Sequence, residues 1–354
     1  MMNKQAMTFW LIISLRLSGK GEFMSSPNHE RSKRKSTMKM KNVFAAASTG
    51  MILLLLAACN MPKPASAPMP TPTEVVMPAT GVEYTFVTNK LLMPTTQEQT
   101  QEFALNVDGD TQNTTDNKFG SLLTLLTSAV RNIELQSTLD QAVDNGQLVS
   151  LHVIKADDAL NDTSVSWSIL QGQQTLTAPS FDGSDKFALD SVAPASLPIV
   201  GSLTNGHFSG GPGAAKVQMV LLGQPLAVDL IGMRLEVDVS AKGCVNGKLG
   251  GAVTVEEFSG KILPPIAEGL NLVIRSDATA ATAILQAFDA DGNGAITSQE
   301  LENNPLLMIA VSPDVDMLDA SGNFNPRQDG VNDSYSVGMG FTCVPATWEL
   351  ALVP

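Results

Sequence analysis

Residues 234–240 read RLEVDVS, and the strict alternation of this stretch decides the fold class of the chain. Leu235, Val237 and Val239 take every second position, with charged residues between them. Because successive side chains of a strand point to opposite faces, this spacing predicts a strand with one apolar and one polar face. Such strands are typical of antiparallel sheets that bury only one face.

The same alternation returns near the C-terminus, where Tyr335, Val337, Met339, Phe341 and Cys343 take every second position. Further strands are predicted at residues 83–88, 149–155, 165–170, 217–222 and 253–256, separated by turns rich in Gly, Asn, Asp and Pro. We therefore expect an α+β, mostly β protein. Its main part is predicted to be an antiparallel β-sandwich-like domain over residues 82–276.

A helical insertion interrupts this domain at about residues 119–145. Leu122, Leu126, Val130 and Ile133 keep helical spacing there. Ser137, with Asp140 three residues later, resembles a capping box for a second helix, and Gly146 is placed to end it.

Residues 289–300, DADGNGAITSQE, have the spacing of a calcium loop. A hard cation takes oxygen ligands from positions 1, 3, 5, 7, 9 and 12 of such a loop, the seventh through its backbone carbonyl and the ninth often through a water. These positions are held by Asp289, Asp291, Asn293, Ala295, Thr297 and Glu300. Gly294 stands at the sixth position, where the chain turns sharply, and Ile296 is placed to point into a core.

The flanks of this loop favour helices. Ile284, Leu285 and Phe288 share one face of an entering helix over residues 278–288, and Pro305 predicts a short exiting helix. With its flanks, residues 277–312, the loop resembles an EF-hand. The resemblance implies Ca²⁺ as the ligand. The alternative is an acidic turn that binds nothing.

Residues 38–59 read MKMKNVFAAASTGMILLLLAAC, with a basic start, an apolar stretch of sixteen residues and a final Leu-Ala-Ala-Cys that ends at Cys59. This layout resembles a bacterial lipoprotein signal, and its last four residues match a lipobox. This length suits a cleaved export signal better than a spanning helix. The resemblance implies that residues 1–58, an upstream extension and the signal, are removed and that Cys59 carries lipid. Asn60 favours delivery to the outer membrane, on its periplasmic or cell-surface face.

Residues 59–81 contain several prolines among small residues and are expected to form a tether. The whole chain has a net charge of −13, but residues 1–58 contain 9 of its 22 basic and 2 of its 35 acidic residues. The rest therefore has 13 basic and 33 acidic residues, a net charge of −20. Such a charge excludes nucleic acid as a partner and attracts divalent cations.

A second acidic stretch lies in residues 313–354, which we expect to form an acidic loop and strands that return to the β domain. Five carboxylates at short spacing form a candidate second calcium site: Asp314, Asp316, Asp319, Asp329 and Asp333. The alternative is a solvated acidic loop. The run 108–116, DGDTQNTTD, is a weaker case, for which a solvated loop is the favoured interpretation.

Cys244 and Cys343 are the only cysteines besides Cys59. Two thiols in an oxidising compartment are usually paired, so we predict a disulfide. His152 is expected on the polar side of its strand and His207 in a Gly-rich turn, and their spacing makes no zinc site. No catalytic residues are assigned, so the sequence does not favour an enzyme.

The lipobox, the proline-rich tether, the DGD turn, the run GCVNGKLGGAV at 243–253 and the calcium loop together resemble a group of bacterial surface lipoproteins without a known activity. We expect a lipid-anchored protein in which calcium has a structural role, with a protein or glycan partner left open. One alternative is a hydrolase, which would show convergent carboxylates or an exposed Ser–His pair in a cleft. The other is an adhesion or assembly module with an exposed apolar patch.

Overall fold

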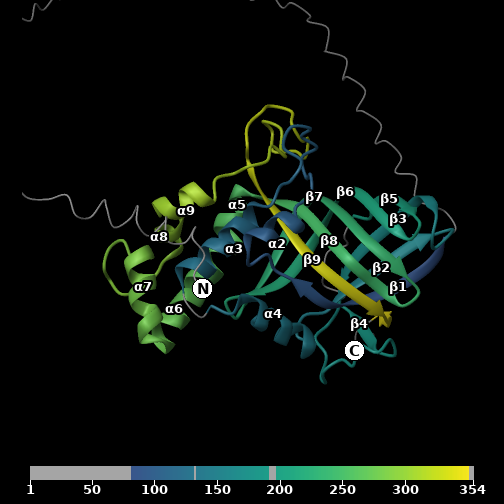
Figure 1. Cartoon of the computed structure of the whole chain (residues 1–354), viewed down its shortest axis with the longest axis horizontal. Coiled ribbons are helices and arrows are strands. Elements are labelled where there is room, and N and C mark those ends of the chain that lie inside the picture. Colours follow the sequence, from purple (N-terminus) through teal and green to yellow (C-terminus); the bar gives the residue numbers. More distant parts are fainter. Residues whose placement is uncertain (1–80, 131–132, 191–196, 351–354) are drawn as a thin grey trace, which may run out of the picture. The chain divides into compact units, whose positions relative to one another are not determined.

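Eight antiparallel strands close into a barrel in the computed structural model of the chain, and most of the helices lie together on one side of it (Figure 1). The structure describes residues 81–130, 133–190 and 197–350; Cys59, the predicted signal and all but the last residue of the predicted tether lie outside these ranges. The barrel strands, in their order around it, are β1 (Val82–Leu92), β2 (Ser150–Ala156), β3 (Asp162–Gln171), β5 (Ile199–Thr204), β6 (His207–Leu221), β7 (Gln224–Ser240), β8 (Gly243–Thr254) and β9 (Ser334–Pro345).

The barrel replaces the two-sheet sandwich that the strand pattern predicts. β9 pairs with β8 on one side and with β1 on the other, so the first and last strands of the sheet join. The apolar face of the sheet therefore closes on itself instead of packing against a second sheet. The sequence predicts that the C-terminal strand returns to the main sheet. This prediction is confirmed, because β9 pairs with both β8 and β1.

The long hairpin of β6 and β7 extends well beyond the strands predicted at 217–222 and 234–240. The tight turn before it, Asn205-Gly206, has φ of +53° and +80°, the backbone that a two-residue hairpin requires. The prediction of a strand at residues 253–256 is wrong for the second half of that range. β8 ends at Thr254, whose side chain accepts a hydrogen bond from the Glu257 N–H and so begins helix α5 (Val255–Glu257).

The barrel interior is filled by side chains. Trp167 and Phe208 are completely buried, and their rings lie 5.0 Å apart. His152, which alternation places on a polar face, instead points inward and is 2% exposed. Its Nδ1 accepts a hydrogen bond from Trp167 Nε1 at 3.1 Å, and its Nε2 lies 2.7 Å from the Thr88 hydroxyl. The prediction fails because these two partners satisfy a polar ring inside the core.

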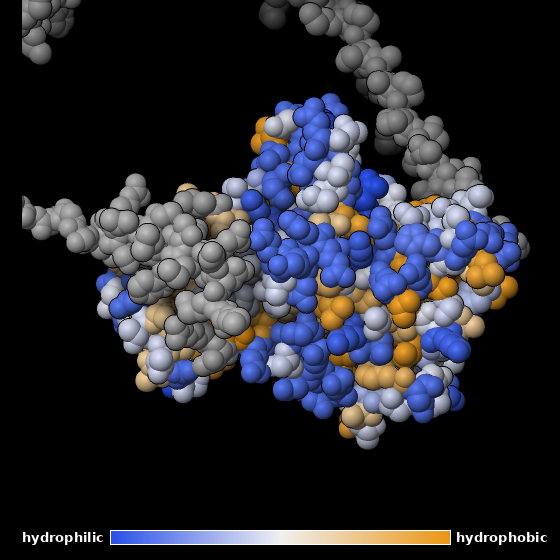
Figure 2. Space-filling model, in the orientation of Figure 1, coloured by the Kyte–Doolittle hydropathy of each residue, from blue (hydrophilic) through white to orange (hydrophobic). Residues whose placement is uncertain are grey.

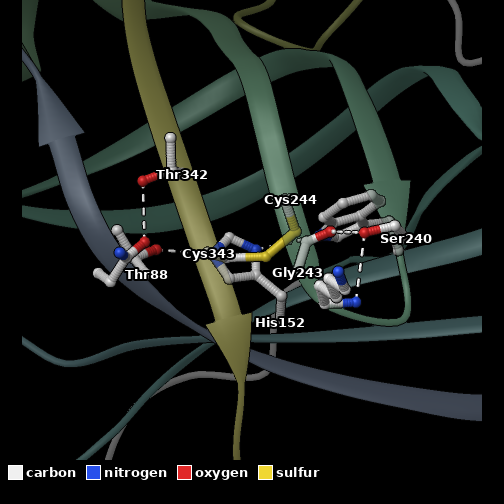
Figure 3. The surroundings of a disulfide bond; sticks show 10 residues. Thr88, His152, Ser240, Gly243, Cys244, Thr342 and Cys343 are labelled. Carbon is white, nitrogen blue, oxygen red and sulfur yellow. Dashed lines mark hydrogen bonds between the residues drawn. A yellow bond between two sulfur atoms is a disulfide. The ribbon is translucent and has the colours of Figure 1, made fainter. Parts of the chain in front are cut away.

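The predicted disulfide is confirmed. Cys244 of β8 and Cys343 of β9 are register partners with their Cα atoms 4.7 Å apart, and the bridge closes a loop with a sequence separation of 99 (Figure 3). Both residues are buried. The bridge therefore joins neighbouring strands next to the interior that contains His152 (Figure 3).

The helices are α2 (Gln97–Glu102), α3 (Lys118–Ala129), α4 (Leu135–Asp144), α5, the π-helix η1 (Phe258–Ile262), α6 (Leu263–Ser276), α7 (Ala278–Phe288), α8 (Ser298–Glu302) and α9 (Pro305–Ala310). α3 packs against β9, α4 against β1 and β6, and α6 against β6 and β7. Their apolar faces join the interior of the barrel in one hydrophobic core. This core fixes the position of α6, whose Asn271 contacts the loop of residues 289–297.

The helical insertion forms as predicted in outline, but its second helix begins earlier. α4 starts at Leu135 after Glu134, and the Ser137 hydroxyl donates to the Glu134 carboxylate, so Ser137 is inside the helix and is no cap. Gly146 follows the helix with φ of +66°, which confirms its place at the end.

A small parallel sheet of β4 (Lys186–Leu189) and β10 (Thr347–Leu350) lies outside the barrel. Phe187 packs there with Val87, Val149, Leu151 and Ala346 in a second apolar cluster. This cluster buries outward-facing residues of β1 and β2, so these strands are apolar on both faces.

Candidate metal site

Residues 289–297 form the loop that joins α7 to α8 (Figure 1). α7 covers residues 278–288, as the sequence predicts. Asp277 caps its start by accepting hydrogen bonds from the N–H groups of Thr279 and Ala280. Ile284 and Phe288 are buried, so the end of the helix is held against the core where the loop begins.

The other side of the loop is fixed by a capping box. The Thr297 hydroxyl accepts from the Glu300 N–H at 3.2 Å, and Glu300 Oε2 accepts from the Thr297 N–H at 2.9 Å. α8 then ends at Glu302, and a separate helix α9 begins at Pro305. The exiting helix is therefore short, as Pro305 predicts.

Three carboxylates meet across the loop. Asp289, Asp291 and Glu300 each offer an oxygen, and these oxygens all lie within 4.8 Å of one another. Among the described residues, no other three carboxylate, histidine or cysteine side chains come together in this way. Glu300 comes from the first turn of α8, so the group closes only because the loop folds back onto that helix.

Backbone N–H groups hold these carboxylates in place. Asp289 Oδ1 accepts from Gly292 N at 2.8 Å, and Oδ2 accepts from Gly294 N at 2.9 Å. Glu300 Oε1 accepts from Ala290 N at 2.9 Å. Hydrogen bonds of this kind favour the ionised form, and the one from Thr297 N contributes most to a lowered pKa of Glu300. The Glu300 side chain is therefore kept as an anion.

Glycine makes the turn possible. Gly294 has φ of +86° and Gly292 has φ of +73°, both in the left-handed region that residues with a Cβ rarely adopt. No atom lies close to a Cβ built on either residue, so the reason for glycine is backbone conformation and not crowding.

Two neutral side chains of the loop also bond to these carboxylates. Asn293 Nδ2 donates to Asp291 Oδ2 at 2.9 Å, while Asn293 Oδ1 accepts from Ala295 N. The Thr297 hydroxyl donates to Glu300 Oε2 at 2.9 Å. Asn293 therefore presents its nitrogen to Asp291, and its oxygen is bonded to the backbone.

Ile296 joins the loop to the core. Its side chain is 3% exposed, while most neighbouring loop residues are exposed. Its backbone is held by Asn271 of α6, whose Nδ2 donates to Ile296 O at 2.7 Å and whose Oδ1 accepts from Ile296 N at 2.8 Å. Asn271 is not among the residues that the sequence motif predicts for this site. It lies 25 residues upstream in another helix, and no local pattern marks it.

The five carboxylates of the candidate second site do not come together. Asp314 binds the N–H and hydroxyl of Ser336, Asp316 accepts from Gly330 N, and Asp333 accepts from the N–H groups of Met317 and Leu318. Asp319 and Asp329 each accept from residues of their own turns. These carboxylates accept hydrogen bonds that a helix or strand would otherwise provide within its backbone. This role explains why so many aspartates occur in the loop, and it requires no metal.

The run 108–116 packs against this acidic loop. Arg327 donates to Gly109 O and lies 3.5 Å from Asp110 Oδ1. Asp116 is 1% exposed, and burial raises its pKa to about 6, helped by the nearby charges of Asp108, Asp314 and Asp110. Its two oxygens accept from Val107 N and Asn113 Nδ2. Asp116 therefore stabilises its own loop through these two hydrogen bonds.

The other described histidine, His207, is exposed, and its Nδ1 lies 2.7 Å from Asp238 of the neighbouring strand. His152 lies inside the barrel, and the hydrogen bonds of both histidines are to residues other than serine.

No family model, curated protein or solved structure matches this chain. Within the residues that the structure describes, no helix has both the length and the apolar character to cross a bilayer.

Proposed function

We propose that this protein binds Ca²⁺ through the loop of residues 289–300 and that the ion has a structural role. The convergence of Asp289, Asp291 and Glu300 within 4.8 Å carries the proposal. Oxygen donors at this spacing suit Ca²⁺, and the Glu at the twelfth position can chelate it with both oxygens. The ligands would be these three carboxylates, Asn293, the carbonyl of Ala295 and Thr297, the last through a water.

Electrostatics supports a bound cation. Three carboxylates on one short loop repel one another, and the exported part of the chain, residues 59–354, has a net charge of −20. A divalent cation relieves this repulsion and draws the entering and exiting helices toward the same point. Three charged ligands and neutral donors indicate modest affinity, and calcium modules outside the cell typically have Kd values of about 10⁻⁴–10⁻³ M.

A structural role fits the position of the loop. α7 packs against α6 and α3, α8 packs against α6, and Leu301, the residue after the last ligand, is completely buried. Ile296 and Asn271 tie the loop itself to the core. An ion in the loop would therefore stabilise the helical side of the protein and not only an exposed turn.

We further propose that the folded part is held at the outer membrane by lipid on Cys59. The lipobox and the basic start of residues 38–59 support this location. Calcium is more available outside the cytoplasm, at concentrations that a site of modest affinity can use.

Calorimetric titration with CaCl₂ tests the calcium site. The wild type should bind one equivalent, and Glu300→Gln should lose most of the affinity because it removes the bidentate carboxylate. Glu302→Gln is the matched control: it makes the same change of charge two residues away, on an exposed side chain whose hydrogen bond comes from Ser259. Absence of binding to the wild type, or equal losses in both variants, would refute the proposal.

A further inference from the structure

A polar cleft lies on the outer face of the barrel, away from the calcium loop. Residues 105–106 form one wall, and strands β5, β6 and β7 form the floor. Its volume is about 450 Å³, which lies within the usual range of small-molecule sites.

Glycines in the floor of the cleft allow the strands to pack closely over a buried ring. Gly201 of β5 pairs with Gly210 of β6. A Cβ on either residue would crowd the buried ring of Phe208, so both glycines face the interior. Ser202 and Ser209, the next residue on β5 and the preceding one on β6, therefore face outward, toward the cleft.

The polar side chains around this hollow have unused hydrogen-bonding capacity. The hydroxyls of Thr163, Ser202 and Ser209 and the carboxylate of Glu236 form no hydrogen bond with any described residue. Ser202 pairs in register with Ser209, and Ser209 with Glu236, so these three side chains form a row across the outer face of the sheet. Their convergence around one hollow therefore points to a ligand with several hydroxyl groups.

Arg234 places a positive group in the cleft, on the same strand as the negative Glu236. Its Nε donates weakly to Val107 O at 3.4 Å, and the guanidinium forms no ion pair with a carboxylate of the described residues. Acidic residues outnumber basic ones by 35 to 22 in the chain, so a partly buried arginine without a carboxylate partner is notable. The fork of donors on a guanidinium matches a carboxylate.

Arg234 and Glu236 are two residues apart on β7 and share its outer face, so their backbone positions are about 7 Å apart. This distance is comparable to the width of a sugar ring with its substituents. A ligand can therefore place an acidic group on Arg234 and its hydroxyls toward Glu236 and the three hydroxyl side chains.

We propose that this cleft binds a sugar acid, a polyhydroxylated ring that carries a carboxylate, either free or as one unit of an acidic glycan. Arg234 binds the carboxylate, and Glu236, Ser202 and Ser209 bind ring hydroxyls. The lining contains no aromatic side chain on which a sugar could stack, so recognition depends on the carboxylate and affinity is weak.

Saturation-transfer NMR on the full chain in calcium-free buffer tests this site independently of the calcium loop. Sodium glucuronate should receive saturation with a Kd in the millimolar range. Glucose, which has the hydroxyls without the carboxylate, and acetate, which has the carboxylate without the ring, should each bind at least tenfold more weakly. Trigalacturonate compared with glucuronate distinguishes a glycan chain from a free sugar acid by which of them binds more tightly.

Arg234→Gln should weaken glucuronate binding at least tenfold, while Arg275→Gln, at an exposed position on α6, should not change it. Ser209→Leu fills the cleft from an exposed strand position and should abolish binding without unfolding the barrel, as circular dichroism would verify. Equal binding of glucose and glucuronate, unchanged binding by Arg234→Gln, or no saturation transfer to glucuronate or trigalacturonate would overturn the proposal.

Discussion

The carboxamide of Asn271 binds both backbone groups of Ile296, donating to its carbonyl at 2.7 Å and accepting from its N–H at 2.8 Å. One side chain of α6 thus pairs with the loop as a neighbouring strand would. α6 is itself packed on β6 and β7, so this pair connects the loop of residues 289–297 to the barrel. The loop is therefore supported from within the same domain.

Replacing Asn271 with Ala should weaken both the fold and calcium binding. The variant leaves two backbone groups of Ile296 without their partner, which costs about 1–3 kcal/mol for each group that stays out of water. Urea denaturation and calcium titration measure the two effects. Gln286→Ala, at an exposed position on α7, is the matched control and should change neither. An Asn271→Ala variant with wild-type calcium affinity would show that the loop does not depend on α6.

Calcium should raise the thermal stability of the protein. Because the ion binds the folded loop and not the unfolded chain, the free energy of unfolding should rise by about 2.7 kcal/mol at a hundredfold excess over Kd. Mg²⁺ should substitute poorly, since it resists coordination by many oxygens with a bidentate Glu. Melts with chelator, with CaCl₂ and with MgCl₂ measure this, and Glu300→Gln should lose most of the calcium-induced shift. A melting temperature that is indifferent to calcium would reduce the loop to an acidic turn.

Removing the disulfide should destabilise the barrel. The bridge between Cys244 and Cys343 spans a sequence separation of 99, for which chain entropy gives about 4–5 kcal/mol before any native strain is subtracted. The double variant Cys244→Ala/Cys343→Ala should therefore unfold at lower urea concentration, by roughly 2–5 kcal/mol. Thiol labelling of the unfolded, unreduced wild type should find no free thiol at these two positions. Labelling of both would contradict the pairing.

Protonation of His152 should weaken the fold in acid. Burial lowers the pKa of His152 to about 3, below its ordinary value of 6.5. Between pH 6.5 and 3 the unfolded chain therefore binds a proton at His152 that the folded protein does not bind. The stability that the folded protein has with neutral His152 is fully present above pH 6.5 and is lost as the pH falls toward 3. The expected loss is about 1.4 kcal/mol for each pH unit well below 6.5.

The measurement is the free energy of unfolding between pH 7 and 4 for wild type and His152→Phe. The variant loses the bonds to Thr88 and Trp167 at every pH, but its stability should fall less steeply in acid. Asp116, with a raised pKa, acts in the opposite direction in both proteins, so the difference isolates His152. Parallel pH profiles would show that His152 does not titrate in this range.

Lipid on Cys59 should hold the protein in the membrane fraction. Cys59→Ser removes the sulfur that would carry the lipid, so the protein should become extractable without detergent. Cys244→Ala/Cys343→Ala keeps Cys59 and should remain in the membrane fraction. If the Ser variant stays bound through residues 1–58, the lipoprotein interpretation is wrong.

The sequence by itself determined the local features of this protein. The strand at 234–240, the helix at 278–288 and the glycine at 294 follow from periodicity, apolar spacing and a positive φ, all of which depend on neighbouring residues. The same reasoning explains why α8 ends before Pro305. The order of donors in residues 289–300 is also local, because a single short loop supplies them.

Only the tertiary structure decided the features that join distant residues. Alternation shows that a strand has an apolar face, but not whether that face packs against a second sheet or lines a closed barrel. The pairing of β1 with β9 closes the sheet into a barrel. The tertiary structure also places His152 inside the barrel, where Trp167 and Thr88 form hydrogen bonds with its ring. The five aspartates of the acidic loop bind separate groups and do not come together. The hydrogen bonds between Asn271 and Ile296 and the cleft beside Arg234 arise in the same way, because they form between segments whose proximity depends on the whole fold.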